Sequence, residues 1–117
     1  MTEFELIRKF FTGQQVARDD VVVGIGDDAA VLAPPAGQQL VVTTDVMVEG
    51  VHFLAHTDPV ALGHKALAVN LSDLAAMGAE PAWFLLNITL PKADEAWLEK
   101  FCHGLFTLAS AYKLQLV

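Results

Sequence analysis

The sequence predicts an α/β sandwich, in which helices pack on one face of a mixed β-sheet. Segments with strand and helix character follow one another as strands, helix, strand, helix and strand. Apolar residues make up 54% of the 117 residues and charged residues only 18%, which is enough to build the core of one domain and argues against disorder.

The N-terminal part is predicted to hold one short helix and three strands. Residues 4–12 have the apolar spacing of an amphipathic helix. The β-branched stretch "VVVGIG" (21–26) predicts a strand, and "AAVLA" (29–33) predicts a second one that two prolines end. "QQLVVTTDVMV" (38–48) has the strongest strand character in the chain, because it is rich in Val and Thr.

The second half predicts two longer helices, each followed by a strand. Asp58 is a suitable N-cap with proline at the first helical position, and Gly78 is a suitable C-terminal glycine for that helix. Residues 81–91 form an apolar stretch between prolines and predict a buried strand. A second amphipathic helix is expected over 94–112, and a further strand over 113–117.

Charge and cysteine content exclude several classes of partner. The net charge of −7 argues against nucleic acid and against an anionic membrane surface. No apolar run reaches the roughly 20 residues of a membrane helix, and the N-terminus is not a signal peptide. Cys102 is the single cysteine, so no internal disulfide is possible and a cytoplasmic location is favoured. Its apolar surroundings predict an inert thiol.

The acidic residues are concentrated in an apolar part of the chain. Between residues 19 and 91 there are nine acids and one base, Lys65. Scattered surface acids are the simplest explanation, but acids in apolar surroundings are costly unless cations meet them. Lys65 is either their counter-ion or a group that reaches a phosphate. The apolar excess also suggests a further buried face, either a dimer interface or the docking surface of a further domain.

The glycine motif "GIGDDA" (24–29) resembles a dinucleotide-binding turn, and Asp45 follows at the spacing of a ribose-binding acid. That fold needs a helix where this chain has "AAVLAPPAGQQ", which is short and contains two prolines. Asp27 and Asp28 would also repel a pyrophosphate. The dinucleotide interpretation is therefore rejected, and no Walker loop is present.

Carboxylates beside a phosphate are explained if Mg²⁺ lies between them, since Mg²⁺ prefers hard oxygen ligands. Suitable groups occur at three places, namely Asp27 with Asp28 after the glycines, Thr43 with Thr44 and Asp45 at the end of the long strand, and Asp73 within the helix. Each has an ordinary alternative. Asp28 suits a turn, the threonines suit a strand, and Asp73 suits the solvated face of a helix.

Histidines offer one further candidate. A lone histidine is more often structural than functional, but His52 follows a glycine beside the acidic residues and could contact an anionic or aromatic substrate. The other histidines have no zinc-ligand spacing with Cys102, so no zinc site is predicted.

Taken together, "GIGDDAAV" (24–31), "TTDVMVEGVHF" (43–53) and "KALAVNLSDLAAMGAEP" (65–81) resemble the thiamine-monophosphate kinase family. The later stretches "PAWFLLNITLP" and "DEAWLEKF" are also similar to that family. The wider superfamily, which includes aminoimidazole-ribonucleotide synthetase and selenophosphate synthetase, has related acidic signatures but not this combination.

The resemblance implies an ATP-dependent kinase that transfers the γ-phosphoryl group of ATP directly, in line, to thiamine monophosphate, giving thiamine diphosphate. It implies several Mg²⁺ ions. No side chain needs to act as a strong base in such a reaction, because a monophosphate near neutral pH already has an anionic oxygen. His52 matches a substrate-contacting position, and Asp27 adjoins the metal-binding set. The matched metal-binding positions are Asp28, Thr43, Thr44, Asp45 and Asp73.

The resemblance also implies that residues 1–117 are the N-terminal metal- and ATP-binding domain of a longer two-domain kinase, inactive alone. Two N-terminal sheets are expected to pair across the two-fold of a homodimer. Two alternatives remain at this point. One is a non-catalytic metal-binding or dimerisation module, and the other is a different ATP-dependent enzyme of the superfamily.

Overall fold

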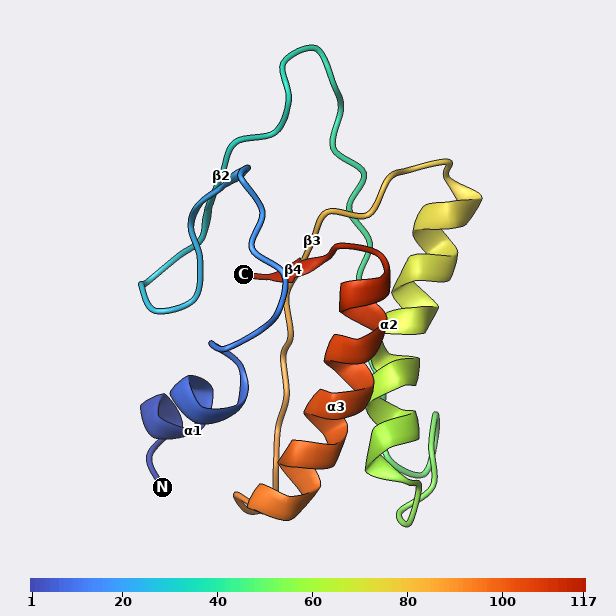
Figure 1. The fold of residues 1–117 in the computed structure, drawn as a ribbon. Helices are drawn as coiled ribbons and strands as arrows, with labels where there is room; N and C mark the ends of the chain where they lie inside the picture. The colour runs from blue at the N-terminus through green and yellow to red at the C-terminus, as the bar shows by residue number, and fades with distance from the viewer.

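The computed structural model describes residues 1–117, and two long helices that lie side by side are its largest feature (Figure 1). The three helices are α1 (Glu3–Phe10), α2 (Pro59–Ala76) and α3 (Glu95–Ala111). The four short strands are β1 (Val21–Val23), β2 (Val31–Leu32), β3 (Trp83–Phe84) and β4 (Gln115–Leu116). The predicted α/β class is confirmed.

Local capping chemistry sets the helix ends where the sequence predicts them. The Asp58 carboxylate accepts a hydrogen bond from the Val60 backbone N–H at 3.2 Å, with Pro59 as the first residue of α2. Gly78 follows the helix with a φ of 68°, a conformation that suits glycine. Asp94 caps α3 in the same way, accepting from the Trp97 N–H.

The strands form two separate two-stranded sheets, which differs from the single mixed sheet that the sequence predicts. β1 and β2 pair antiparallel, while β3 and β4 pair parallel and are joined by α3 as a crossover helix. Figure 1 shows α2 and α3 running in the same direction.

The predicted strand over 38–48 is wrong, because that segment has no ladder. Its residues have strand character, but a strand needs a neighbour to receive its backbone hydrogen bonds, and none lies beside it here. Val42 is 81% exposed as a result. The predicted strand over 81–91 is likewise reduced to Trp83–Phe84, and Leu85 is 78% exposed.

The core lies where α3 packs against α2 and β4. Leu98, Leu105 and Leu114 are fully buried. The helices approach so closely that a Cβ on Gly63 would overlap the carbonyl oxygen of Phe101, and one on Gly104 would overlap that of Val60. These two glycines are therefore required by packing.

Burial also explains why the cysteine thiol is unreactive. Cys102 lies in this core with 7% of its surface exposed, and burial raises the pKa of its thiol to about 12. The thiol is therefore protonated at neutral pH, as the prediction of an inert core cysteine requires.

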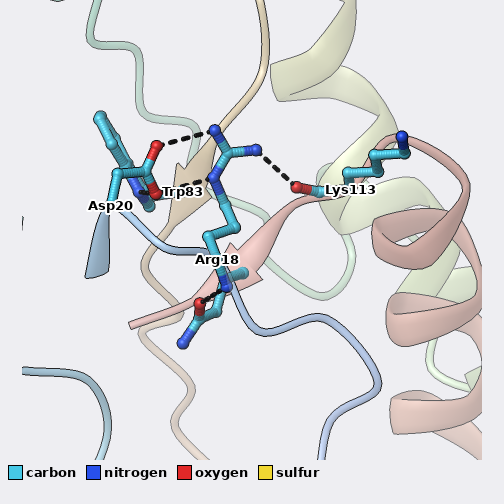
Figure 2. A network of polar contacts seen from close by, with 5 residues as sticks. Arg18, Asp20, Trp83 and Lys113 are labelled. Carbon is cyan, nitrogen blue, oxygen red and sulfur yellow. Dashed lines mark hydrogen bonds and ion pairs between the residues drawn. The ribbon is translucent and has the colours of Figure 1, made fainter. Parts of the chain in front are cut away.

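A polar network joins the segment before β1 to β3 and β4 (Figure 2). The Arg18 guanidinium donates two hydrogen bonds to the Asp20 carboxylate, at 3.0 and 2.9 Å, and a third to the Lys113 carbonyl oxygen. Trp83 Nε1 donates to Asp20 at 2.9 Å, and the Gln115 side chain accepts from the Arg18 N–H. Arg18 also lies over the Trp83 ring.

The molecule exposes 8124 Å². A compact monomer of 12.6 kDa is expected to expose about 6,200 Å². On the extended segment that precedes α2, seven large apolar side chains are exposed: Leu40, Val41, Val42, Val46, Val48, Val51 and Leu54. No helix of the structure is long and apolar enough to cross a membrane.

Candidate functional site

The candidate site is a strip along one face of α2. Lys65, Val69 and Asp73 are spaced four residues apart, so they lie on the same side of the helix, over about 12 Å of its length. The extended segment 43–52 contacts this face, and Figure 1 shows the chain descending beside α2 before it reaches the loop that precedes the helix.

At the C-terminal end of the strip, segment 43–45 meets Asp73. The Thr43 hydroxyl donates a long hydrogen bond of 3.4 Å to Asp73 Oδ2. Thr43 is half-buried, while Thr44 and Asp73 are exposed to solvent. The structure therefore brings together two of the predicted metal ligands that lie 30 residues apart in the sequence.

At the other end of the strip, a cavity of about 180 Å³ is lined by acidic, basic and apolar groups. Asp45 and His52 come from the extended segment, and Lys65 comes from α2. Lys65 Nζ donates to the His52 carbonyl oxygen at 2.6 Å. The remaining walls are apolar and are formed by Val46, Met47 and Val69. The predicted substrate-contacting residue and the predicted metal ligand Asp45 thus share one cavity.

Asp28 lies elsewhere. Its backbone N–H donates to Asp27 Oδ1 at 2.8 Å in the turn between β1 and β2. Figure 1 shows the β1–β2 hairpin on the other side of β3 and β4 from α2. No three His, Cys, Asp or Glu side chains of the chain come close enough to hold one metal ion. The acids Asp28, Asp45 and Asp73 therefore do not converge within this chain.

The donor groups of the strip nevertheless suit Mg²⁺. Asp45 and Asp73 offer carboxylate oxygens, and Thr43 and Thr44 offer hydroxyl oxygens, which are the hard ligands that Mg²⁺ prefers. The Thr43 hydroxyl occupies one Asp73 oxygen and leaves the other free of that bond. The strip therefore fits cations that are also held by water or phosphate oxygens.

Two parts of the site are absent from the sequence-based prediction. One is the apolar wall with Met47 and Val69, and the other is the backbone carbonyl oxygen of His52. The spacing from Lys65 to Asp73 indicates that Val69 lies on the same face. The position of segment 43–52 along that face depends on tertiary packing, and no local pattern specifies it.

Comparison with known proteins decides the family. Residues 26–117 match the family of AIR synthase related protein, N-terminal domain. The chain belongs to this family. The match begins after β1 and covers the turn with Asp27 and Asp28, β2 and the strip along α2, so every candidate site residue lies within the AIR synthase related domain.

Relatives within this family have names that agree with the motifs. The chain is 55% identical, over 98% of its length, to the thiamine-monophosphate kinase of Escherichia coli (strain K12). It is 46% identical, over its whole length, to that of Haemophilus influenzae. A crystal structure of thiamine-monophosphate kinase from Stenotrophomonas maltophilia K279a matches 86% of the chain with a TM-score of 0.80 and 55% identity.

These comparisons confirm the resemblance found in the sequence motifs, and the solved structure confirms the α/β fold. The chain spans about a third of the length of these proteins: 35% and 36% of the two relatives, and 32% of the solved chain.

Proposed function

We propose that this chain is the metal- and ATP-binding domain of an ATP-dependent kinase that converts thiamine monophosphate to thiamine diphosphate. The observation that carries the proposal is 55% identity, over 98% of the chain, to a protein named thiamine-monophosphate kinase. The acidic strip along α2 supports it, because two polyanionic substrates can approach each other only where their charge is neutralised.

In this proposal the protein positions phosphates and supplies no strong base. A phosphate monoester already has an anionic oxygen near neutral pH, so direct in-line transfer requires only alignment. Several Mg²⁺ ions would supply the charge neutralisation. They would be held by Asp28, Thr43, Thr44, Asp45 and Asp73. More than one ion is proposed because the resemblance to thiamine-monophosphate kinases implies several, which together neutralise both phosphate groups.

His52 is proposed to contact thiamine monophosphate. Its ring Nδ1 accepts a hydrogen bond from the Val48 N–H at 2.9 Å, so the neutral ring carries its proton on Nε2. An Nε2–H group beside the cavity can donate to a substrate oxygen. The apolar wall with Met47 and Val69 gives the same cavity a surface suited to a ring.

We further propose that residues 1–117 act within a longer two-domain protein, in the cytoplasm, and that the domain is inactive alone. A homodimer of this domain is proposed as well. Its support is the exposed area of 8124 Å², which exceeds the compact-monomer value by far more than the roughly 800 Å² per partner that a standard interface buries. Nucleic acid and membrane are not proposed as partners, given the net charge of −7.

The test is an acceptor survey with the full-length protein. Purified protein, ATP and Mg²⁺ are incubated with thiamine monophosphate, thiamine or an unrelated nucleoside monophosphate, and the phosphorylated products are quantified. Thiamine diphosphate should form from the monophosphate alone. Equal transfer to the nucleoside monophosphate, or no transfer at all, would contradict the proposal. Residues 1–117 assayed alone should give no product.

A further inference from the structure

The turn over residues 48–53 is held largely by its own backbone. The Val48 carbonyl oxygen accepts hydrogen bonds from Val51 and His52, and the Gly50 N–H donates to the Phe53 carbonyl oxygen at 2.7 Å. Gly50 has a φ of 81°, which a side chain at this position would disfavour. These bonds fix the shape of the turn, but they do not fix its position relative to α2.

An apolar contact and a hydrogen bond attach the turn to the rest of the molecule. The Phe53 side chain is half-buried and packs against the core. The only hydrogen bond between the turn and α2 is the one from Lys65 Nζ to the His52 carbonyl oxygen, at 2.6 Å. Phe53 is therefore the apolar anchor and Lys65 is the polar anchor.

Lys65 has no competing carboxylate partner. The two ion pairs of the structure are Lys9 with Glu95 and Arg18 with Asp20. Although Asp45 lines the same cavity, the Lys65 ammonium group donates to a backbone oxygen. A charged donor strengthens such a bond relative to a neutral one. The contact therefore serves to hold the backbone of His52.

We propose that Lys65 is a positioning residue, which holds the 48–53 turn so that His52 faces the cavity and thereby determines the affinity for the phosphoryl acceptor. This inference rests on the proposed kinase function. Lys65 acts on the acceptor through His52, so its loss affects acceptor binding more than ATP binding or turnover.

The experiment compares Lys65→Met and Lys65→Arg in the full-length protein. Met keeps an unbranched apolar chain without a donor, and Arg restores a charged donor. Lys100→Met is the control, because Lys100 is an exposed lysine of α3 without a hydrogen bond. The readouts are kcat, the KM for thiamine monophosphate, the KM for ATP, and the amide hydrogen exchange of residues 48–53.

The K65M variant should raise the KM for thiamine monophosphate about tenfold, with kcat and the KM for ATP changed less than about twofold. Amide exchange within the turn should become faster. The K65R variant should recover most of the loss, and K100M should match the unmodified protein. Unchanged KM for thiamine monophosphate in K65M, unchanged amide exchange of the turn, or an equal rise in both KM values would each overturn the inference.

The result that would contradict the proposed function differs from the result that would contradict the role of Lys65. If the unmodified protein makes no thiamine diphosphate, the kinase assignment fails, and the role of Lys65 in acceptor affinity fails with it. Amide exchange still decides whether Lys65 holds the turn, because that readout needs no substrate.

Discussion

The ionisation of Asp20 makes the stability of the fold depend on pH. The hydrogen bonds from Arg18 hold the pKa of the Asp20 carboxyl below its ordinary value, and the bond from Trp83 acts in the same direction. A lowered pKa in the folded state means that the ionised carboxylate favours folding. Its contribution is complete above the ordinary pKa of about 4 and is lost as the pH falls through the folded-state value.

We therefore predict that Asp20→Asn lowers the free energy of unfolding at pH 6, by on the order of 1 kcal/mol, since a partly exposed pair is screened by solvent. The difference between the variant and the unmodified protein should shrink as the pH falls from 5 to 3. Urea unfolding followed by tryptophan fluorescence measures both quantities. Asp19→Asn is the matched control, because the adjacent Asp19 has no hydrogen-bonded partner; an equal effect there would contradict the prediction.

At the same scale, the residue types of the site were predictable, but their arrangement was not. The hard oxygen ligands Thr43, Asp45 and Asp73 are recognisable from residue type, and the structure places all three along α2. Asp28 belongs to the same sequence signature, yet it lies in the β1–β2 turn. Residues far apart in sequence meet through tertiary packing, which periodicity and local motifs do not encode.

At the scale of elements, the helix boundaries can be predicted from neighbouring residues, whereas the strands cannot. Asp58, Asp94 and Gly78 set helix boundaries through bonds within a few residues, so the sequence alone specifies them. A strand instead depends on a neighbour that is distant in sequence. Segment 38–48 has the composition of a strand but no partner strand, and most of its residues remain exposed.

The contact between α2 and α3 yields a stability prediction. Gly63→Ala and Gly104→Ala should each destabilise the protein by about 2–3 kcal/mol, because the new methyl group meets a backbone carbonyl that cannot move aside alone. This loss of stability exceeds the gain of about 1 kcal/mol that the higher helix propensity of alanine provides. Denaturant unfolding provides the measurement.

Gly13→Ala is the control for these two variants. No atom lies within 4 Å of a Cβ at that position, and its φ is not in the left-handed region. Its effect should stay within about 0.5 kcal/mol. Stabilities of G63A and G104A that match G13A would show that the helices do not approach as closely as the structure shows.

A smaller loss of stability is predicted for removal of the N-cap of α2. Asp58→Ala removes the side-chain oxygen that accepts from the Val60 N–H, so the first turn of α2 loses one bonded donor. The expected loss is about 1 kcal/mol of unfolding free energy. Asp58→Ser, which restores an acceptor at the N-cap, should recover most of it, whereas equal losses for both variants would contradict a capping role.

At the scale of the whole molecule, the exposed surface predicts self-association. Val42 is 81% exposed within the apolar stretch 40–54, so Val42→Lys places a charge where a dimer partner is proposed to pack. Sedimentation equilibrium of the unmodified protein should show a dimer, and the variant should associate at least about tenfold more weakly. A monomer at high protein concentration, or equal association of both proteins, would contradict the proposed dimer.

The proposed function depends on Asp45 and Asp73, which are proposed to hold divalent cations along α2 so that two phosphate groups can react. Its most direct test is the rate of thiamine diphosphate formation by the full-length protein against Mg²⁺ concentration, for the unmodified protein, Asp45→Asn and Asp73→Asn. We expect no product without a divalent cation, and a loss of about a hundredfold in kcat/KM with a higher Mg²⁺ requirement for each variant. Full activity of both variants, or product formation in excess chelator, would contradict it.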